Sequence, residues 1–523
     1  MQKTRYLKMV RLAAIAASLL ALSLGHAIAQ TAQSYSGILS VMWGDPKPGA
    51  ASGGAMLFEL TMPDGSTHPL QIDAARTNAA VQFFGKRVTV QGRVDNAAAP
   101  GPSTIVVDDI KSAEPANGAA EQQKAKKVTR KVLFVLLQYK GDTENTHPAR
   151  FYTKELTNPQ TPPAGSKTPA SINGFFNKTS WGKLQWKGDV AGKTGLNSTK
   201  WFVLPGTKTD YANCGWDGVC AKLTQMRNDA LALVTAAGVD YTVYDNINFV
   251  INNDLDCCAW GGSFSDGTKS YGQTFEPPWS QEAGTYVHEM GHSIGLPHSG
   301  WVYYDYDSHH DEMSRGAYAS YIQCGSYNSV NDGKSDPIDC VEPGAGYIAV
   351  HKDFLGWIPG ANKATVKKKQ TKTFTIEAMA LPLGSDLKMV KICLFGETCT
   401  GGDGSDAHFL TVEAKMKVAK YEMGLPSEGI VIHDVQMDRP PIPPSVTHTC
   451  YFNNQSGWAV PVDATPGDFT GYPTCSPYDT AGHALMNMPF VVGQTYKNTA
   501  LHVTVKVMSK TATTMTVRVA RTK

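Results

Sequence analysis

Short apolar runs separated by turn residues fill the first quarter of the chain. Four runs at 35–43, 55–62, 86–94 and 103–110 have the length and β-branched content of strands, and PDGS at 63–66 is a turn. This pattern predicts a small all-β module over residues 30–114, with about five strands and an OB-like barrel as its arrangement. Residues 115–130 are rich in Ala, Gln and Lys without apolar periodicity, so we expect a linker.

The pattern changes to mixed helix and strand over residues 131–360. KVLFVLLQ and INFVIN are apolar enough for buried strands, and SYGQTF has the composition of an exposed one, to which an extended substrate could pair. Two segments have the spacing of apolar residues that predicts a helix: ASINGFFNKTS, and residues 219–238, whose helix should end at Gly238. Another helix should begin after Pro277-Pro278, with Ser280 as its N-cap.

Residues 361–523 contain one apolar strand pattern after another and no long helical pattern. This predicts a β-sandwich-like C-terminal domain. The expected fold class is therefore multidomain α+β, with an α/β central domain between two β-rich ones.

The first 29 residues have the organisation of a secretory signal peptide. Basic residues precede the apolar run at 12–24, and Ala27-Ile28-Ala29 supplies a small-x-small cleavage site, so the mature chain should begin near Gln30. The run is too short for a membrane anchor, and no later segment reaches a spanning length. We expect a secreted or periplasmic protein with no membrane span.

The charge balance gives no reason to expect a nucleic-acid partner. Lys and Arg total 48 against 46 Asp and Glu, for a formal charge of +2. Lysine-rich runs at 124–131 and 363–372 lack interleaved aromatic residues and are more typical of solvated segments.

The cysteine content fits an oxidising compartment, because the chain has ten cysteines and no repeated CxxC. The spacing predicts disulfides 214–220 and 393–399, with 324–340 and 450–475 as further pairs. Cys257 and Cys258 are adjacent, which disfavours a bond between them in ordinary trans geometry, so their partners stay open.

The stretch HEMGHSIGLPH at 288–298 carries the clearest chemical signal. His288 and His292 are four residues apart, hence about 40° around a helix and about 6 Å along it, so both imidazoles can bind one cation. Glu289 is rotated by about 100° from His288 and can lie beside the ion. Gly295 can take the left-handed conformation that ends a helix, which lets the chain turn back and bring His298 to the same ion.

Three histidine ligands with an open fourth position are typical of a catalytic zinc ion. The ion would acidify a bound water, and Glu289 would accept its proton as general base, so the sequence predicts hydrolysis of peptide bonds. Substrates would be proteins or peptides; the sequence does not indicate an oligomeric state.

The motif HExxHxxGxxH resembles the signature of the metzincin zinc peptidases, and the segments up to GYIAVHKDFLGWIP resemble the gametolysin family and immune-inhibitor-A-like peptidases. This resemblance covers about residues 130–360. It implies that His288, His292 and His298 are zinc ligands, that Glu289 is the general base, and that Met313 forms the apolar floor of the methionine turn.

Two departures from that family limit what carries over. The position two residues after Met313 is Arg315, with Tyr318 further on, so no tyrosine role is assigned near zinc. Some relatives are kept latent by a propeptide cysteine, whereas the first cysteine here is Cys214, so any latency must use another device. The N-terminal module could be a propeptide or a lasting accessory domain.

Alternatives remain for several neighbouring residues. Four aromatic residues could either line the substrate pocket or pack beneath the loop: Trp301, Tyr303, Tyr304 and Tyr306. His309 and His310 are alternative metal ligands, and calcium at 331–336 is a weak possibility, since NDGKSD lacks EF-hand spacing. The rival functions are an inactive secreted adhesin or glycan-binding protein on the same scaffold, and a zinc hydrolase acting on a non-peptide amide or ester.

Overall fold

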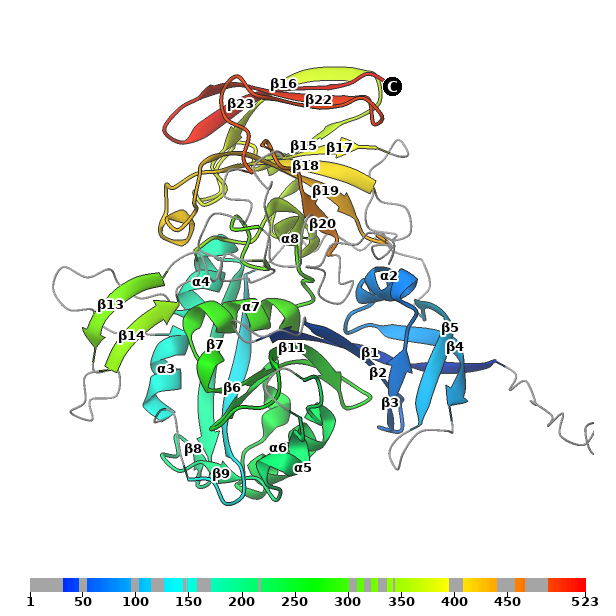
Figure 1. Ribbon diagram of the computed structural model, residues 1–523, viewed down its shortest axis with the longest axis vertical. Coiled ribbons are helices and arrows are strands. Elements are labelled where there is room, and N and C mark those ends of the chain that lie inside the picture. The colour runs from blue at the N-terminus through cyan, green and yellow to red at the C-terminus, as the bar shows by residue number, and fades with distance from the viewer. Residues whose placement is uncertain are drawn as a thin grey trace, which may run out of the picture.

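The computed structural model has a mixed α+β fold in which strands dominate (Figure 1). It describes residues 32–46, 54–95, 103–113, 127–143, 147, 149–157, 171–214, 218–300, 308–314, 321–327, 336–341, 344–394, 408–439, 457–465 and 488–523. The expected signal peptide, most of the linker and the candidate calcium segment lie outside these residues.

Five strands near the N-terminus close into a ring in the order β1-β2-β3-β5-β4-β1. They are β1 (Gln33–Pro46), β2 (Ala55–Thr61), β3 (Thr67–Gln71), β4 (Arg87–Asp95) and β5 (Thr104–Ser112), with the short helix α2 (Thr77–Val81) between β3 and β4. Leu39, Val41 and Leu60 are buried inside this ring. We call residues 32–113 the N-terminal ring.

The central sheet continues from β1 in the order β1-β11-β12-β10-β6-β7-β8. Its strands are β6 (Val128–Gln138), β7 (Leu184–Gly192), β8 (Gly195–Leu196), β10 (Asn246–Ile251), β11 (Cys258–Ser265) and β12 (Ser270–Glu276), while β9 (Phe202–Val203) pairs with β6. Strands β12, β10, β6 and β7 are parallel, and β11 is antiparallel to β12. Figure 1 shows β1 leaving the ring to run along β11.

The expectation that SYGQTF is an exposed strand is wrong. These residues form β12, an interior strand hydrogen-bonded on both sides and buried from Tyr271 onward. Polar groups of the strand find partners inside the fold: the Gln273 side-chain amide donates to the Ser263 carbonyl at 3.0 Å, and the Gln273 backbone carbonyl accepts from the Ser293 hydroxyl at 3.0 Å. Without β1, the central sheet would therefore end at β11 on one side and at β8 on the other, and β1 covers the β11 edge.

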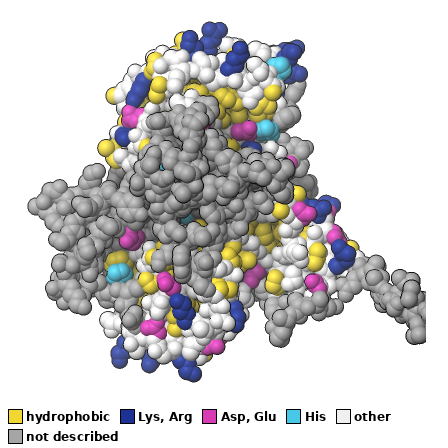
Figure 2. Space-filling model, viewed as in Figure 1, with side chains coloured by type: hydrophobic (Ala, Val, Ile, Leu, Met, Phe, Trp, Pro, Cys, Tyr) yellow, Lys and Arg dark blue, Asp and Glu magenta, His cyan; other side chains and the backbone are white. Residues whose placement is uncertain are grey.

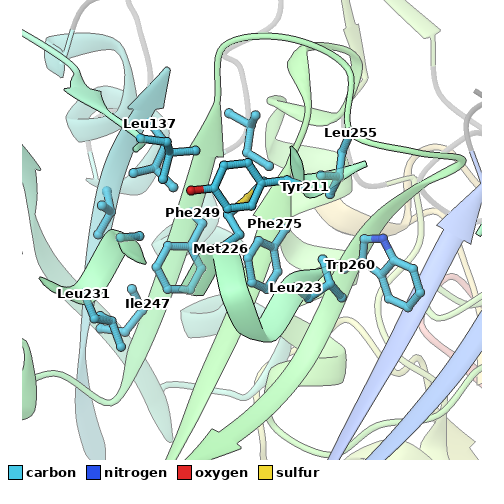
Figure 3. Packing of buried hydrophobic residues seen from close by; sticks show 14 of the residues in the cluster. Leu137, Tyr211, Leu223, Met226, Leu231, Ile247, Phe249, Leu255, Trp260 and Phe275 are labelled. Atoms are coloured by element: carbon cyan, nitrogen blue, oxygen red, sulfur yellow. The ribbon is translucent and has the colours of Figure 1, made fainter. Parts of the chain in front are cut away.

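Helices cover both faces of the central sheet. They are α3 (Ala149–Thr157), α4 (Ile172–Thr179), α5 (Lys208–Tyr211), α6 (Leu223–Ala236) and α7 (Ala283–Ser293), whereas α8 (Ala349–Phe354) lies against β18 of the C-terminal region. Helix α6 packs on one face, where Met226 and Leu231 meet Phe249 and Phe275 (Figure 3). On the other face, α4 and α7 share a core with β6. The helices expected from ASINGFFNKTS and from 219–238 are both present, with Ser171 as N-cap of α4 and Gly238 at φ +76° after α6.

Two sheets form the C-terminal region, one of order β15-β17-β18-β19-β20 and one of order β16-β23-β22-β21. The strands are β15 (Lys363–Val366), β16 (Gln370–Glu377), β17 (Met389–Cys393), β18 (His408–Lys415), β19 (Gly429–Gln436), β20 (Ala459–Pro461), β21 (Thr495–Asn498), β22 (Val503–Lys510) and β23 (Thr514–Arg521). Side chains from both sheets, such as Val412, Ile432 and Val517, form one core. A separate pair is β13 (Tyr321–Tyr327) with β14 (Asp336–Val341).

The core of the N-terminal ring is completed by residues from the end of the chain. Trp458, Val435 and Ile348 belong to the same apolar cluster as Trp43 and Val88. Hydrogen bonds join the same parts: the Trp458 indole donates to the Asn78 carbonyl at 3.3 Å, and the Asn78 amide donates to the Arg439 carbonyl at 2.9 Å. Figure 1 shows α2 lying close to the sheet that contains β19 and β20.

The disulfides agree with the sequence at one pair and disagree at another. Cys214 is bonded to Cys220 as expected, but Cys257 is bonded to Cys258, contrary to the expectation that adjacent cysteines would not pair. The chain turns sharply into β11 there, and Asp256 holds the turn by accepting the backbone N–H of Cys258 at 3.1 Å. The expectation relied on the difficulty of this bond across an ordinary trans peptide, and the structure nevertheless pairs the two cysteines.

The remaining expected pairs are described only in part. Cys393 is disulfide-bonded, while Cys399 lies outside the described residues. The Cys450–Cys475 pair also lies outside them, as do the side chains of Cys324 and Cys340. Among the cysteines that the structure describes, none is free. These bonds are compatible with an extracellular or periplasmic protein.

The described surface carries charges of both signs. Figure 2 shows acidic side chains among the lysines and arginines on the lower part of the face drawn. Of the helices in the described ranges, none has both the length and the apolar character needed to cross a lipid bilayer.

Candidate metal centre

Helix α7 begins two residues later than the sequence suggests. Pro278–Ser280 form a separate 3-10 turn, and the Ser280 hydroxyl donates to the Pro277 carbonyl at 2.9 Å. Ser280 is therefore used to close that turn and is not the N-cap, a position that Glu282 takes. The side-chain amide of Gln281 donates to the Ile251 carbonyl at 2.8 Å and so fixes the start of α7 to β10.

The three predicted histidines converge as the motif geometry requires. His288 and His292 lie on α7, which ends at Ser293. Gly295 has φ +93°, and the backbone N–H of Leu296 donates to the Gly291 carbonyl at 3.1 Å, which closes the turn after the helix. The chain then returns, so that His298 Nε2 lies 3.1 Å from His292 Nε2.

A fourth residue, which the sequence did not indicate, lies at the centre of this group. The Asp45 carboxylate comes from the end of β1 and is 2.8 Å from His298 Nε2, 3.2 Å from His292 Nε2 and 3.4 Å from His288 Nε2. The four side chains are buried and form a cluster that could hold a metal ion. In the sequence Asp45 is only the residue between a glycine and a proline after an apolar strand, which is also typical of a turn.

The donor atoms fit a tetrahedral cation. With bonds of about 2.0–2.1 Å, ligand atoms at the corners of a tetrahedron lie about 3.3 Å apart. The spacings of 2.8–3.4 Å between the nitrogens and the Asp45 oxygens are close to that value.

Hydrogen bonds from the far side of two rings fix which nitrogen faces the cluster. His288 Nδ1 donates to the Glu312 carbonyl at 2.6 Å and His292 Nδ1 donates to the Leu296 carbonyl at 2.7 Å. Burial lowers the pKa of His292 to about 3, so this imidazole is neutral and its Nε2 lone pair points at the Asp45 carboxylate. A cation bound between them would relieve the contact of these two acceptors, and the backbone carbonyls would then act as the outer supports of a metal site.

Glu289 lies beside the same centre and not within the ligand set. Burial raises its pKa well above the ordinary glutamate value, and the neighbouring carboxylates of Asp45 and Glu276 raise it further. Gly261 of β11 packs directly on Glu289, because a Cβ built at Gly261 would overlap the Glu289 backbone carbonyl and lie 2.7 Å from its Oε2. The carboxyl group is thus held between α7 and β11, within reach of a group bound at the cluster.

Met313 lies under the cluster. Its side chain is fully buried, and a Cβ at Gly291 would overlap its sulfur, so the glycine lets the methionine approach α7. The Met313 carbonyl accepts the backbone N–H of Ser299 at 2.9 Å, directly after the third histidine. This segment therefore supports both His288, through the Glu312 carbonyl, and the turn that presents His298.

Trp43 is a second residue that β1 contributes to the centre. Its ring stacks on the His292 imidazole with 4.7 Å between centroids and 10° between planes. Gly44, between Trp43 and Asp45, passes over the Trp260 ring of β11, where a Cβ would come within 2.7 Å of the indole. The glycine therefore allows β1 to approach closely enough for Asp45 to reach the histidines.

Other sequence candidates are not part of this cluster. His310 Nε2 donates to the Ser427 carbonyl at 3.2 Å, and burial lowers the pKa of this histidine to about 3. His309 is buried nearby and is not a member of the metal-binding group found among the described residues. The aromatic candidates at 301–306, together with Arg315 and Tyr318, lie outside the described residues.

Comparison with known proteins gives no name to this arrangement. No family model matches the chain. A search of curated proteins also finds no match. The function must therefore be argued from the chemistry of the cluster around Asp45, His288, His292 and His298.

Proposed function

We propose that the chain is an exported zinc-dependent endopeptidase. The observation that carries this proposal is the convergence of three histidine nitrogens, with tetrahedral spacing, beside the buried carboxyl group of Glu289. Nitrogen-rich tetrahedral sites of this kind favour zinc over calcium or magnesium, which prefer oxygen ligands. Resemblance of HEMGHSIGLPH to the metzincin signature supports the same function.

The chemistry divides between the cation and the chain. A bound zinc ion would supply a water of lowered pKa and polarise the carbonyl of the scissile peptide. Glu289 would accept the proton of that water and would deliver it to the departing amine, since its carboxyl group is confined beside the centre. His288 and His292 keep their Nε2 atoms aimed at the centre because backbone carbonyls hold their Nδ1 protons.

The test compares Glu289→Ala with the wild-type chain, both with the N-terminal ring removed, on casein and on a peptide library read by mass spectrometry. We expect the variant to keep stoichiometric zinc, measured by elemental analysis, and to lose roughly three orders of magnitude in kcat/KM. A matched control is Glu282→Gln at the start of the same helix, which should retain activity.

The outcomes separate the rival functions. A chelator should abolish cleavage, and added zinc should restore it. Equal activity of Glu289→Ala and wild type would refute the mechanism. Zinc binding without cleavage of any peptide would favour an inactive binding protein, and cleavage of esters or non-peptide amides alone would favour a different hydrolase.

A further inference from the structure

We propose that Asp45 is a fourth protein ligand of the metal and that β1 occupies the substrate edge of the sheet, so that the N-terminal ring inhibits the centre until it is released. The inhibitory part rests on the proposed peptidase function. The ligand assignment rests on geometry alone.

The first step is the position of the Asp45 carboxylate. A catalytic zinc ion keeps one position open for water or substrate, whereas Asp45 lies 2.8–3.4 Å from all three histidine nitrogens. Carboxylate oxygen is an ordinary zinc ligand, with bonds of about 2.0–2.2 Å. A cation at this centre would therefore have its fourth position filled by the chain itself, which excludes the attacking water.

The second step is the path of β1 along β11. Met42–Pro46 pair antiparallel with Gly262–Cys258, and Asp45 lies opposite Ala259. Among the strands of the central domain β11 is an edge strand, and its Gly261 packs against Glu289. An extended peptide would need the same edge for its main-chain hydrogen bonds if its carbonyl is to reach the centre. β1 therefore occupies the place that a substrate requires.

The third step is that the occupied state is stabilised by contacts away from the centre. Arg227 of α6 and Glu59 of β2 form a buried ion pair at 3.6 Å, and the hydroxyl of Thr224 donates to the same carboxylate. The Arg227 guanidinium also lies 5.0 Å from the centre of the Phe264 ring. These contacts, together with the stacking of Trp43 on His292, hold the N-terminal ring in one orientation. They therefore stabilise the pairing of β1 with the edge strand β11.

The fourth step distinguishes inhibition from a permanently closed structural site. A structural zinc site uses four protein ligands and has no need of a further carboxyl group. Here Glu289 is fully buried, and Gly261 of β11 confines its carboxyl group beside the cluster. Glu289 can act as a general base only after the Asp45 carboxylate has left the fourth metal position. The arrangement with Asp45 at the metal is therefore a temporary, inhibited state.

Release requires a cut between the ring and the central domain. Residues 115–127 contain Lys124, Lys126 and Lys127, so a protease that cleaves after lysine could separate the two parts. After the cut the ring would be held only by non-covalent contacts, and the high effective concentration that the tether provides would be lost.

The ligand assignment is tested on the full chain by zinc affinity, measured in competition with a chromogenic chelator. Asp45→Ala and the isosteric Asp45→Asn should both weaken zinc binding by at least about tenfold. The matched control is Asp64→Ala, in an exposed turn of the same ring, which should bind zinc as the wild type does. Unchanged affinity in both Asp45 variants would overturn the assignment.

Access to the centre gives a second readout that needs no catalysis. Acetohydroxamate, a small chelating probe, should bind the zinc-loaded Asp45→Ala chain and the ring-free chain in calorimetry but not the wild-type chain. Binding to the wild-type chain with equal affinity would show that the fourth position is open and would overturn the proposal.

Activity then separates the two proposals. Cleavage of a quenched fluorescent peptide by the full chain should rise by about tenfold or more after a lysine-specific protease has cut within residues 115–127, and the gain should disappear in Glu289→Ala. An uncut chain as active as the cut chain would overturn inhibition and leave the peptidase function standing. Weakened zinc binding in the Asp45 variants, without peptide cleavage in any form, would refute the peptidase function and leave the ligand assignment standing.

Discussion

Replacing Lys415 by methionine should destabilise the chain strongly, because this lysine neutralises a buried carboxylate. Lys415 Nζ donates to Glu422 Oε1 at 3.0 Å and to the Gly346 carbonyl at 2.7 Å, and both charged side chains are almost fully buried. Removing one partner of a buried ion pair costs about 3–5 kcal/mol. At about 2–4 °C per kcal/mol, the unfolding midpoint should fall by roughly 6–20 °C.

The loss of stability in Lys415→Met should depend on pH because of the ionisation of Glu422. Burial raises the pKa of Glu422, which Lys415 and Lys352 partly offset, so removal of Lys415 should raise it further. A carboxyl group with a raised folded-state pKa loses stability as pH rises from its unfolded value through the folded one. The deficit of Lys415→Met should therefore grow as the pH rises above the ordinary pKa of a glutamate.

The assay is thermal unfolding followed by tryptophan fluorescence, with Lys415→Met/Glu422→Leu as the matched double variant. Replacing both charges by apolar groups should recover most of the lost stability. A deficit below about 3 °C at pH 8, or no recovery in the double variant, would refute the reasoning.

Two further predictions concern the centre and the disulfides. Gly261→Ala should lower kcat of the ring-free chain while zinc content stays stoichiometric, because the new Cβ would overlap the Glu289 carbonyl; unchanged kcat would contradict the packing of β11 on α7. A peptide map of the unreduced protein should contain Cys257 and Cys258 bonded to each other; free thiols at these positions, or a bond from either to another cysteine, would show that the turn at Asp256 is wrong.

The parts of the centre that were predictable from sequence are those with local causes. His288 and His292 follow from the helical period, and Gly295 has the positive φ that the return of His298 requires. Asp45 could not be predicted, since it reaches the centre through the pairing of β1 with β11, and no local pattern encodes such a distant contact. The division into domains and the metzincin resemblance stay predictions.

The errors in the fold have a similar origin. SYGQTF was expected to be exposed because its side chains are polar, yet the strand lies inside the sheet, where the Gln273 side-chain amide donates to the Ser263 carbonyl. Ser280 was expected to cap α7, but the preceding prolines form a turn that uses its hydroxyl. In both cases tertiary hydrogen bonds decided where a polar residue lies, and composition could not indicate this.

The apolar cluster that contains Trp43, Val88 and Trp458 can be completed only late in the synthesis of the chain. Its members come from the first five strands with α2 and from the part of the chain between Ile348 and Ala459. The first five strands can pair as soon as they are made, but their interior stays open to water until Val435 and Trp458 have been added. A chain truncated before β19 should therefore expose this interior and aggregate, even though every residue of the first five strands is present.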